Sequence, residues 1–170
     1  MKIMGLAGWS GSGKTTLVCK LIPELIRRGV TVSTIKHAHH TFDIDKPGKD
    51  SYEHRAAGAS QVMVSSAHRW ALMTEHRGAP EPVLKDLIAE MAPVDLLLVE
   101  GFKKDSHRKL EIYRASVGKP MLCRDDPAIV GVASDEDLPS VSLPVIDLND
   151  IAAVADFVLA QAEDGFGTTE

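Results

Sequence analysis

The sequence predicts an α/β fold with a mostly parallel sheet flanked by helices, and three observations lead to that prediction. Residues 2–7 form a short apolar run, which a glycine-rich turn and an amphipathic segment of helical periodicity follow. Residues 30–36 are β-branched and complete a strand, helix, strand order suited to a parallel crossover. Residues 94–99 are the most apolar run, as expected for a strand that is buried on both faces.

The other elements follow from the same patterns. A helix is expected from residue 16 to residue 28, where Gly29 stops it and Pro23 distorts it. Apolar residues at helical spacing predict further helices over residues 51–57, over residues 81–91 and from residue 151, the last capped by Asn149 or Asp150. Additional strands are expected at residues 109–114, 120–123, 128–133 and 145–147.

Residues 61–65 and 70–74 predict a protruding β-hairpin, because two short strand-like runs are joined by a link of hairpin length. Exposed strand edges pair readily with other strands. We therefore expect the hairpin to be a surface for pairing with another chain.

Composition limits the classes of partner. The chain has 170 residues, and we expect a single domain over residues 1–163 with a flexible tail over residues 164–170. A net charge of −5 argues against nucleic acid and membrane surfaces as partners, and no apolar run is long enough to span a bilayer. A cytoplasmic location is expected. Cys19 and Cys123 are expected to be buried free thiols rather than a disulfide.

The stretch Gly8-Trp9-Ser10-Gly11-Ser12-Gly13-Lys14-Thr15 fits the spacing G-x-x-x-x-G-K-[ST] of a phosphate-binding loop. Its glycines let backbone N–H groups approach a phosphate, Lys14 supplies a positive charge, and the Thr15 hydroxyl is placed to ligate Mg²⁺. The helix that follows adds the positive end of its dipole. The stretch, extended to Thr16, predicts the nucleotide site of a P-loop NTPase, in which Lys14 also serves catalysis.

Glu100 ends the apolar strand, at the sheet edge where the phosphate loop is expected. A carboxylate there suits Mg²⁺ or a positioned water, so Glu100 is a candidate catalytic and metal-binding residue, with a capping or salt-bridging role as the alternative. Asp43, Asp45 and Asp50 lie in the polar loop after the second strand, where a switch segment reaches the terminal phosphate. For Asp50, catalysis and helix capping are equally supported.

Other polar residues give weaker indications. Lys49 and Lys103 add positive charge for an anionic cofactor or partner, and His37 is a third candidate for such a contact. His37, His39 and His40 favour hydrogen bonding over a structural metal, because a strand end directs at most two of them to one side. Ser134 and Asp135 are candidates for contacting a nucleobase, although a Ser-Asp turn is an equal alternative. From these residues alone, GTP and ATP are not distinguished.

The chain resembles the family of molybdopterin-guanine dinucleotide biosynthesis protein B (MobB) over nearly its whole length. The resemblance rests on residues 8–16, 35–37, 45–51, 69–75 and 98–103, and the regions 133–135 and 147–150 look similar as well. It implies a homodimeric GTP-binding protein with slow, Mg²⁺-dependent hydrolysis, which assists a MobA-like guanylyltransferase in attaching GMP to molybdopterin. Molybdopterin is then a further possible ligand. Residues 106–124 are less similar to that family.

A second class of function stays open beside this adapter role. Small-molecule kinases and dethiobiotin synthetase, an ATP-dependent ligase, use a similar phosphate loop on a similar sheet, and fold alone does not choose between the classes. The sequence shows no arginine-rich lid segment and no clear substrate base, which favours the adapter.

Overall fold

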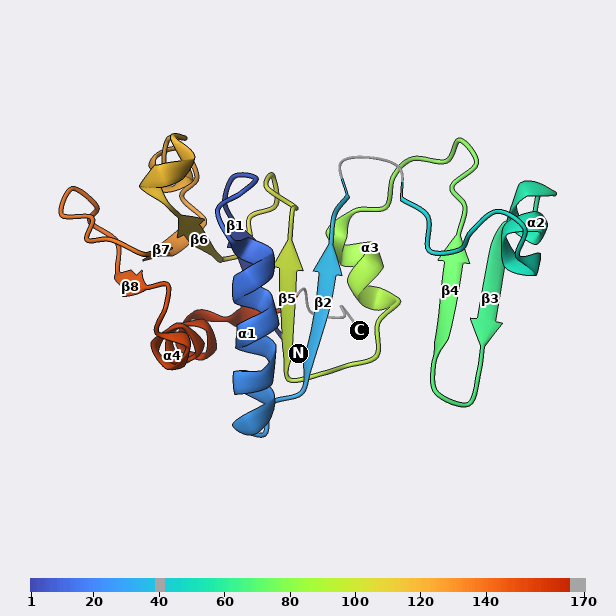
Figure 1. Ribbon diagram of the computed structural model, residues 1–170, viewed down its shortest axis with the longest axis horizontal. Coiled ribbons are helices and arrows are strands. Elements are labelled where there is room, and N and C mark those ends of the chain that lie inside the picture. Colours follow the sequence, from blue (N-terminus) through green and yellow to red (C-terminus); the bar gives the residue numbers. More distant parts are fainter. Residues whose placement is uncertain (39–41, 166–170) are drawn as a thin grey trace. The chain divides into compact units, whose positions relative to one another are not determined.

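The computed structural model describes residues 1–38 and 42–165, which fall into two compact units (Figure 1). The first unit consists of Met1–His37 and of the chain from Glu90 onward, and the second is Ala38–Ala89. No helix within the described ranges is long and apolar enough to cross a membrane.

The first unit is built on a parallel sheet with the strand order β2-β5-β1-β6-β7-β8. Its strands are β1 (Lys2–Ala7), β2 (Val32–Lys36), β5 (Leu96–Glu100), β6 (Lys109–Tyr113), β7 (Ile129–Ser134) and β8 (Val145–Asp147). The short strand β9 (Glu163–Asp164) pairs antiparallel with the start of β1. Because the five pairings between these six strands are all parallel, the carboxyl ends of the strands meet at one edge of the sheet.

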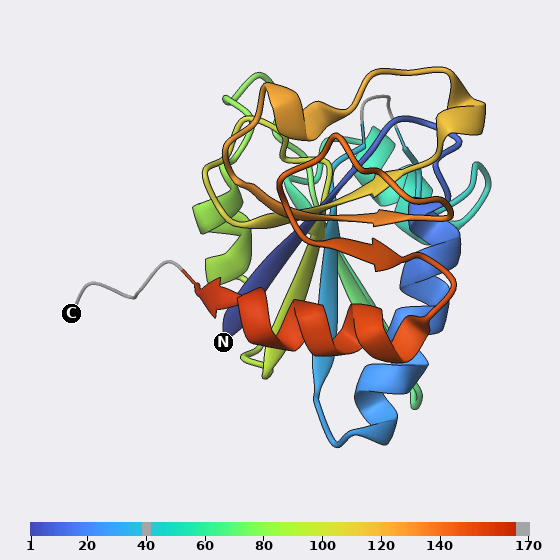
Figure 2. The ribbon, with the colours of Figure 1, turned by 90° about the vertical axis from the view of Figure 1, so that its left-hand side faces the viewer.

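Two helices cover one face of this sheet, and they lie side by side in Figures 1 and 2. Helix α1 (Lys14–Arg27) continues through Pro23, and helix α4 (Ile151–Gln161) is capped by the Asp150 carboxylate, which accepts a bond of 3.0 Å from the N–H of Ala153. The core between the helices and the sheet contains fully buried side chains from both, including Met4, Leu21, Leu98, Leu110 and Val158. The predicted α/β architecture is confirmed.

The other face of the sheet contains charged groups that are withdrawn from solvent. His107, Lys109 and Glu111 are each less than 5% exposed. The Lys109 ammonium donates to the carbonyls of Lys103 and Asp105 and to the Asp126 carboxylate, at 3.0, 2.6 and 2.9 Å. These bonds anchor the loops on both sides of β6 to the sheet.

The strand predicted at residues 120–123 is wrong. This segment forms the 3₁₀ turn η2 (Leu122–Arg124), which follows an earlier turn, η1 (Ala115–Val117). The backbone N–H groups of Leu122 and Cys123 donate to the two oxygens of buried Glu111, at 2.7 and 2.8 Å, and so are not available to a neighbouring strand. Cys19 and Cys123 are both free, but neither is buried as predicted, since Cys19 is exposed on α1 and Cys123 is partly exposed.

The second unit contains helix α2 (Asp50–Ala56), strands β3 (Gln61–Ser65) and β4 (Trp70–Thr74), and helix α3 (Leu84–Ala89). Within the part of the chain that the structure describes, strands β3 and β4 pair only with each other, in the predicted hairpin. Helix α3 is shorter than expected because residues that precede Pro82 and Pro93 avoid helical backbone angles.

Candidate nucleotide-binding site

The phosphate loop joins β1 to α1 through backbone conformations that glycine adopts readily and other residues rarely adopt. Gly8 and Gly13 have φ angles of 148° and 94°, and Gly13 occupies the cap position of α1. A Cβ atom at Gly8 would lie 2.5 Å from the Ile112 carbonyl oxygen and 2.7 Å from the Ser12 hydroxyl. The Ser12 hydroxyl is buried and has no hydrogen-bond partner among residues 1–38 and 42–165. The loop is therefore held tightly against the end of β6, and its other polar residues, Ser10, Thr15 and Thr16, are exposed.

Lys14 folds back over this loop. Its ammonium group donates to the carbonyl oxygens of Gly8 and Trp9, at 2.8 and 3.0 Å. Burial lowers the pKa of Lys14 below 10.5, the nearby Glu100 carboxylate opposes this shift, and the Lys103 and Lys36 ammonium groups add to it. A phosphate in the loop would relieve the repulsion among these lysines.

Glu100 lies next to the loop, as expected from its position at the end of β5. It pairs in register with Leu6 of β1 on one side and with Lys36 of β2 on the other. Its carboxylate lies 3.5 Å from the Lys36 ammonium, so the salt bridge considered as an alternative role is present. The backbone N–H of His37 donates to the Glu100 carbonyl oxygen, and the His37 ring lies 5.2 Å from that of Phe102.

Arg114 is a site residue that the sequence analysis missed. It follows β6, and its Nε donates to the Ser12 carbonyl oxygen of the phosphate loop at 3.2 Å. Its guanidinium also pairs with the Asp135 carboxylate at 2.6 Å. Its position in the sequence could have indicated this role, because a charged residue directly after a parallel strand lies at the same sheet edge as the phosphate loop.

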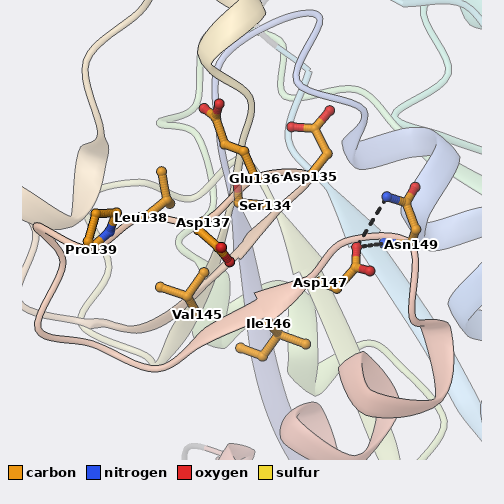
Figure 3. Close-up of a pocket in the computed structure, with 10 residues that line it drawn as sticks. All are labelled: Ser134, Asp135, Glu136, Asp137, Leu138, Pro139, Val145, Ile146, Asp147 and Asn149. Atoms are coloured by element: carbon orange, nitrogen blue, oxygen red, sulfur yellow. Dashed lines mark hydrogen bonds between the residues drawn. The ribbon is translucent and has the colours of Figure 1, made fainter.

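A cavity of about 750 Å³ opens beyond the ends of β7 and β8 (Figure 3). Predicted residues Ser134 and Asp135 line it, together with residues from two further segments, namely Glu136, Asp137, Leu138, Pro139, Val145, Ile146, Asp147 and Asn149. One Asp147 oxygen accepts bonds from the backbone and side-chain nitrogens of Asn149, at 2.8 and 3.1 Å. The Ser134 hydroxyl accepts a bond from the N–H of Glu136, which is the Ser-Asp turn considered above.

The predicted residues of the polar loop belong to the second unit. Asp43 and Asp45 both pair with Arg55, at 2.7 and 2.8 Å, which assigns them a structural role there. Lys49 occupies the cap position of α2, so Asp50 is the first residue of the helix and not its cap. The approach of Lys49 and Asp50 to a nucleotide stays a prediction.

The histidine cluster is only partly described, because His39 and His40 lie outside the described residues. Among residues 1–38 and 42–165, no group of three or more histidine, cysteine or acidic side chains is arranged to hold a metal ion. In nucleotide sites Mg²⁺ takes part of its oxygen ligands from the phosphates. The exposed Thr15 and the nearby Glu100 fit that arrangement, since Mg²⁺ commonly combines one or two protein ligands with phosphates and waters.

Comparison with known proteins gives a consistent result. Residues 3–135 match the family described as "Molybdopterin guanine dinucleotide synthesis protein B" (MobB). The chain is 46% identical over 160 residues to the molybdopterin-guanine dinucleotide biosynthesis adapter protein of Escherichia coli, covering 92% of this chain and 91% of that protein. It is 44% identical over 159 residues to the protein of the same name from Haemophilus influenzae, covering 92% and 86% of the two chains.

The fold of this chain is also similar to that of a solved MobB structure. The crystal structure of Bacillus subtilis MobB superimposes with a TM-score of 0.72 at 25% identity, covering 97% of this chain and all of that one. The phosphate loop, Glu100 and Asp135 all lie within residues 3–135, the region that matches the family. The two adapter proteins are similar to this chain over most of their length. The chain therefore belongs to the MobB family.

Proposed function

We propose that this protein is a GTP-binding adapter in the biosynthesis of molybdopterin-guanine dinucleotide, where it assists a guanylyltransferase that attaches GMP to molybdopterin. The observation that carries this proposal is the joint position of the Lys14 loop, Glu100 and the carboxylate-lined cavity at one sheet edge of a MobB-family chain. The relatives named as adapters in this biosynthesis support the pathway.

The cavity chemistry supports guanine over adenine. The hydrogen-bonding edge of guanine presents N–H donors at N1 and N2, whereas adenine presents an acceptor at N1. Asp147 has one oxygen engaged by Asn149, which leaves its second oxygen as an acceptor, and Asp135 adds another carboxylate to the wall. Carboxylates accept from both guanine donors and repel the adenine N1 acceptor, which supports GTP as the nucleotide in this proposal.

Hydrolysis is proposed to be slow and to depend on Mg²⁺. In this account Lys14 neutralises the terminal phosphates, Thr15 and Glu100 hold the ion or a water attached to it, and Asp50 is the candidate for orienting the attacking water. A bound Mg²⁺ neutralises negative charge on the phosphates. An adapter that uses the nucleotide to time contact with a partner does not need fast turnover.

The homodimer is proposed to form through the hairpin. In the register of β3 and β4, Met63 lies opposite Leu72, and Trp70 lies two residues before Leu72 on the same face. These three side chains are 61%, 39% and 66% exposed, so the hairpin carries an apolar face of the kind that self-association covers. Its unpaired strand edges offer a second means of contact.

The test compares GTP and ATP turnover by the purified protein, alone and with molybdopterin and the partner guanylyltransferase. We expect slow turnover of GTP alone, little turnover of ATP, and a higher yield of the guanine dinucleotide when this protein is added. Fast turnover without the partner, accompanied by phosphorylation of a small molecule, would instead support the kinase or ligase class.

A further inference from the structure

Trp9 occupies a variable position of the phosphate loop, and its ring is fixed in place. The indole N–H donates to the Pro120 carbonyl oxygen at 2.7 Å, across 111 positions of the sequence. The indole is only partly buried, so the side chain retains accessible surface beside the loop. A phosphate in the loop is bound through backbone N–H groups and Lys14, which leaves the Trp9 ring without a role in that contact.

Two lysines lie over this ring. The Lys103 ammonium is 5.2 Å from the centre of the indole, and the Lys119 ammonium is 5.9 Å from it. Both side chains are exposed, and neither has an acidic partner among the described residues. Lys103 is also near enough to Lys14 to help lower its pKa. Cation–π contact accounts for part of this arrangement, but it does not remove the repulsion between like charges.

The position of this cluster differs from that of the nucleobase cavity. The cavity lies at the ends of β7 and β8, whereas Lys103 follows β5, on the opposite side of β1 in the strand order. The loops after β1 and β5 are adjacent at the upper edge of the sheet in Figure 1. A nucleotide whose base fills the cavity and whose phosphates lie over Lys14 therefore leaves Trp9, Lys103 and Lys119 available to a second ligand.

We propose that Trp9, Lys103 and Lys119 form a second ligand site, which binds a phosphorylated heteroaromatic ring of the pterin phosphate class beside the nucleotide. The partly exposed indole supplies an aromatic contact for the flat ring. The two ammonium groups supply charge-assisted hydrogen bonds to the phosphate, whose charge also relieves their mutual repulsion. This inference rests on the proposed function, since a protein that assists transfer of GMP to molybdopterin has reason to hold a pterin near its nucleotide.

The test is a calorimetric titration of neopterin monophosphate into the full-length protein, with saturating GDP and Mg²⁺. We expect the probe to bind while GDP is present. Lys103→Ala and Lys119→Ala should each weaken probe binding by roughly tenfold, because each removes a charge-assisted hydrogen bond. The matched control is Lys104→Ala, since Lys104 is an exposed lysine next to Lys103 without a contact to the indole. Unphosphorylated neopterin should bind at least tenfold more weakly than its monophosphate.

Two results would overturn the inference. One is competitive displacement of the probe by GDP, which would assign the cluster to the nucleotide itself. The other is unchanged probe affinity in the Lys103→Ala, Lys119→Ala double variant. Titration of GDP alone and of the probe alone separates this inference from the proposed function. Absence of GDP binding contradicts the nucleotide function, whereas lysine-dependent binding of the probe would still support the second site.

Discussion

Arg114 connects the two ends of the candidate nucleotide site. It donates to the Ser12 carbonyl of the phosphate loop and pairs with Asp135 at the wall of the base cavity. A Cβ atom at Gly13 would lie 3.4 Å from the Arg114 Nε, so the side chain lies directly against the turn that starts α1. One guanidinium thus orders both the loop that holds the phosphates and a carboxylate proposed to contact the base.

We expect Arg114→Ala to weaken GTP binding by about fivefold. Loss of two partly exposed hydrogen bonds should cost about 1 kcal/mol of binding free energy, because solvent screens them. Fluorescence titration with a labelled GTP analogue measures the effect. Arg124→Ala is the control, since Arg124 is an exposed arginine on the nearby turn η2. Equal affinities of the Arg114→Ala variant and the wild type would show that the link does not order the site.

Glu111 is a buried carboxylate whose role is structural. It is fully buried on β6, and it accepts the N–H groups of Leu122 and Cys123. We expect Glu111→Ala to lower the free energy of unfolding by about 2–5 kcal/mol, because two partly buried N–H groups lose their acceptors and a buried side chain is truncated. Urea denaturation provides the measurement. Exposed Glu136, in the loop after β7, is the matched control, and Glu136→Ala should change stability by about 0.5 kcal/mol or less. A similar small loss for Glu111→Ala would contradict this role.

Among the secondary-structure elements, local sequence patterns predicted most strands and helices. They failed where a side chain distant in the sequence determines the backbone conformation. The apolar run at β5, the β-branched run at β2 and the Asp150 cap of α4 depend on neighbouring residues, and each was predicted. The segment that became η2 looked like a strand, but its backbone donors are bound by Glu111, eleven positions earlier. A pattern of neighbouring residues does not indicate such a contact.

The candidate site likewise contains some features that the sequence predicted and some that it did not. The phosphate loop was predictable because its spacing encodes its geometry. The position of Glu100 was predictable because parallel strands end at one edge. Trp9 and Lys103 were predicted as candidate site residues, but Arg114 and the grouping of Lys103 and Lys119 around Trp9 were not, because they depend on contacts between residues far apart in the sequence. The alternative helix cap at Asp50 was wrong by one residue, since the cap position is Lys49.

The hairpin gives a prediction for assembly. We expect Met63→Asp to weaken the proposed homodimer, because it places a charge on the exposed apolar face that Met63 shares with Leu72. Analytical ultracentrifugation over a range of concentrations should show a shift toward monomer. His68→Ala, in the turn of the same hairpin, is the control and should leave the association unchanged. A wild-type protein that is monomeric at all concentrations would refute the dimer itself.

At the scale of the whole molecule, buried His107 should make stability depend on pH. Burial, and then the Lys109 ammonium, lower the pKa of His107 below 6.5, whereas Asp105, Glu163 and Asp126 oppose the shift. The unfolded chain therefore binds a proton more readily than the folded one. Stability is retained above the unfolded pKa and is lost as the pH falls below it.

Thermal unfolding between about pH 5 and pH 7 tests this dependence. We expect His107→Gln to show a smaller loss of stability on acidification than the wild type. Exposed His76 provides the control, because His76→Gln should keep the wild-type slope. Parallel curves for the wild type and His107→Gln would mean that His107 does not contribute to the acid sensitivity.

The central claim is that the loop around Lys14 binds GTP in a protein of the MobB family, and calorimetric titration of GTP with Mg²⁺ tests it most directly. We expect the wild type to bind GTP more tightly than ATP, and Lys14→Ala to weaken GTP binding by roughly 100-fold while the fold is retained. Lys20→Ala, an exposed lysine on the same helix, should bind as the wild type does. Equal GTP affinity in the wild type and in Lys14→Ala would contradict the account.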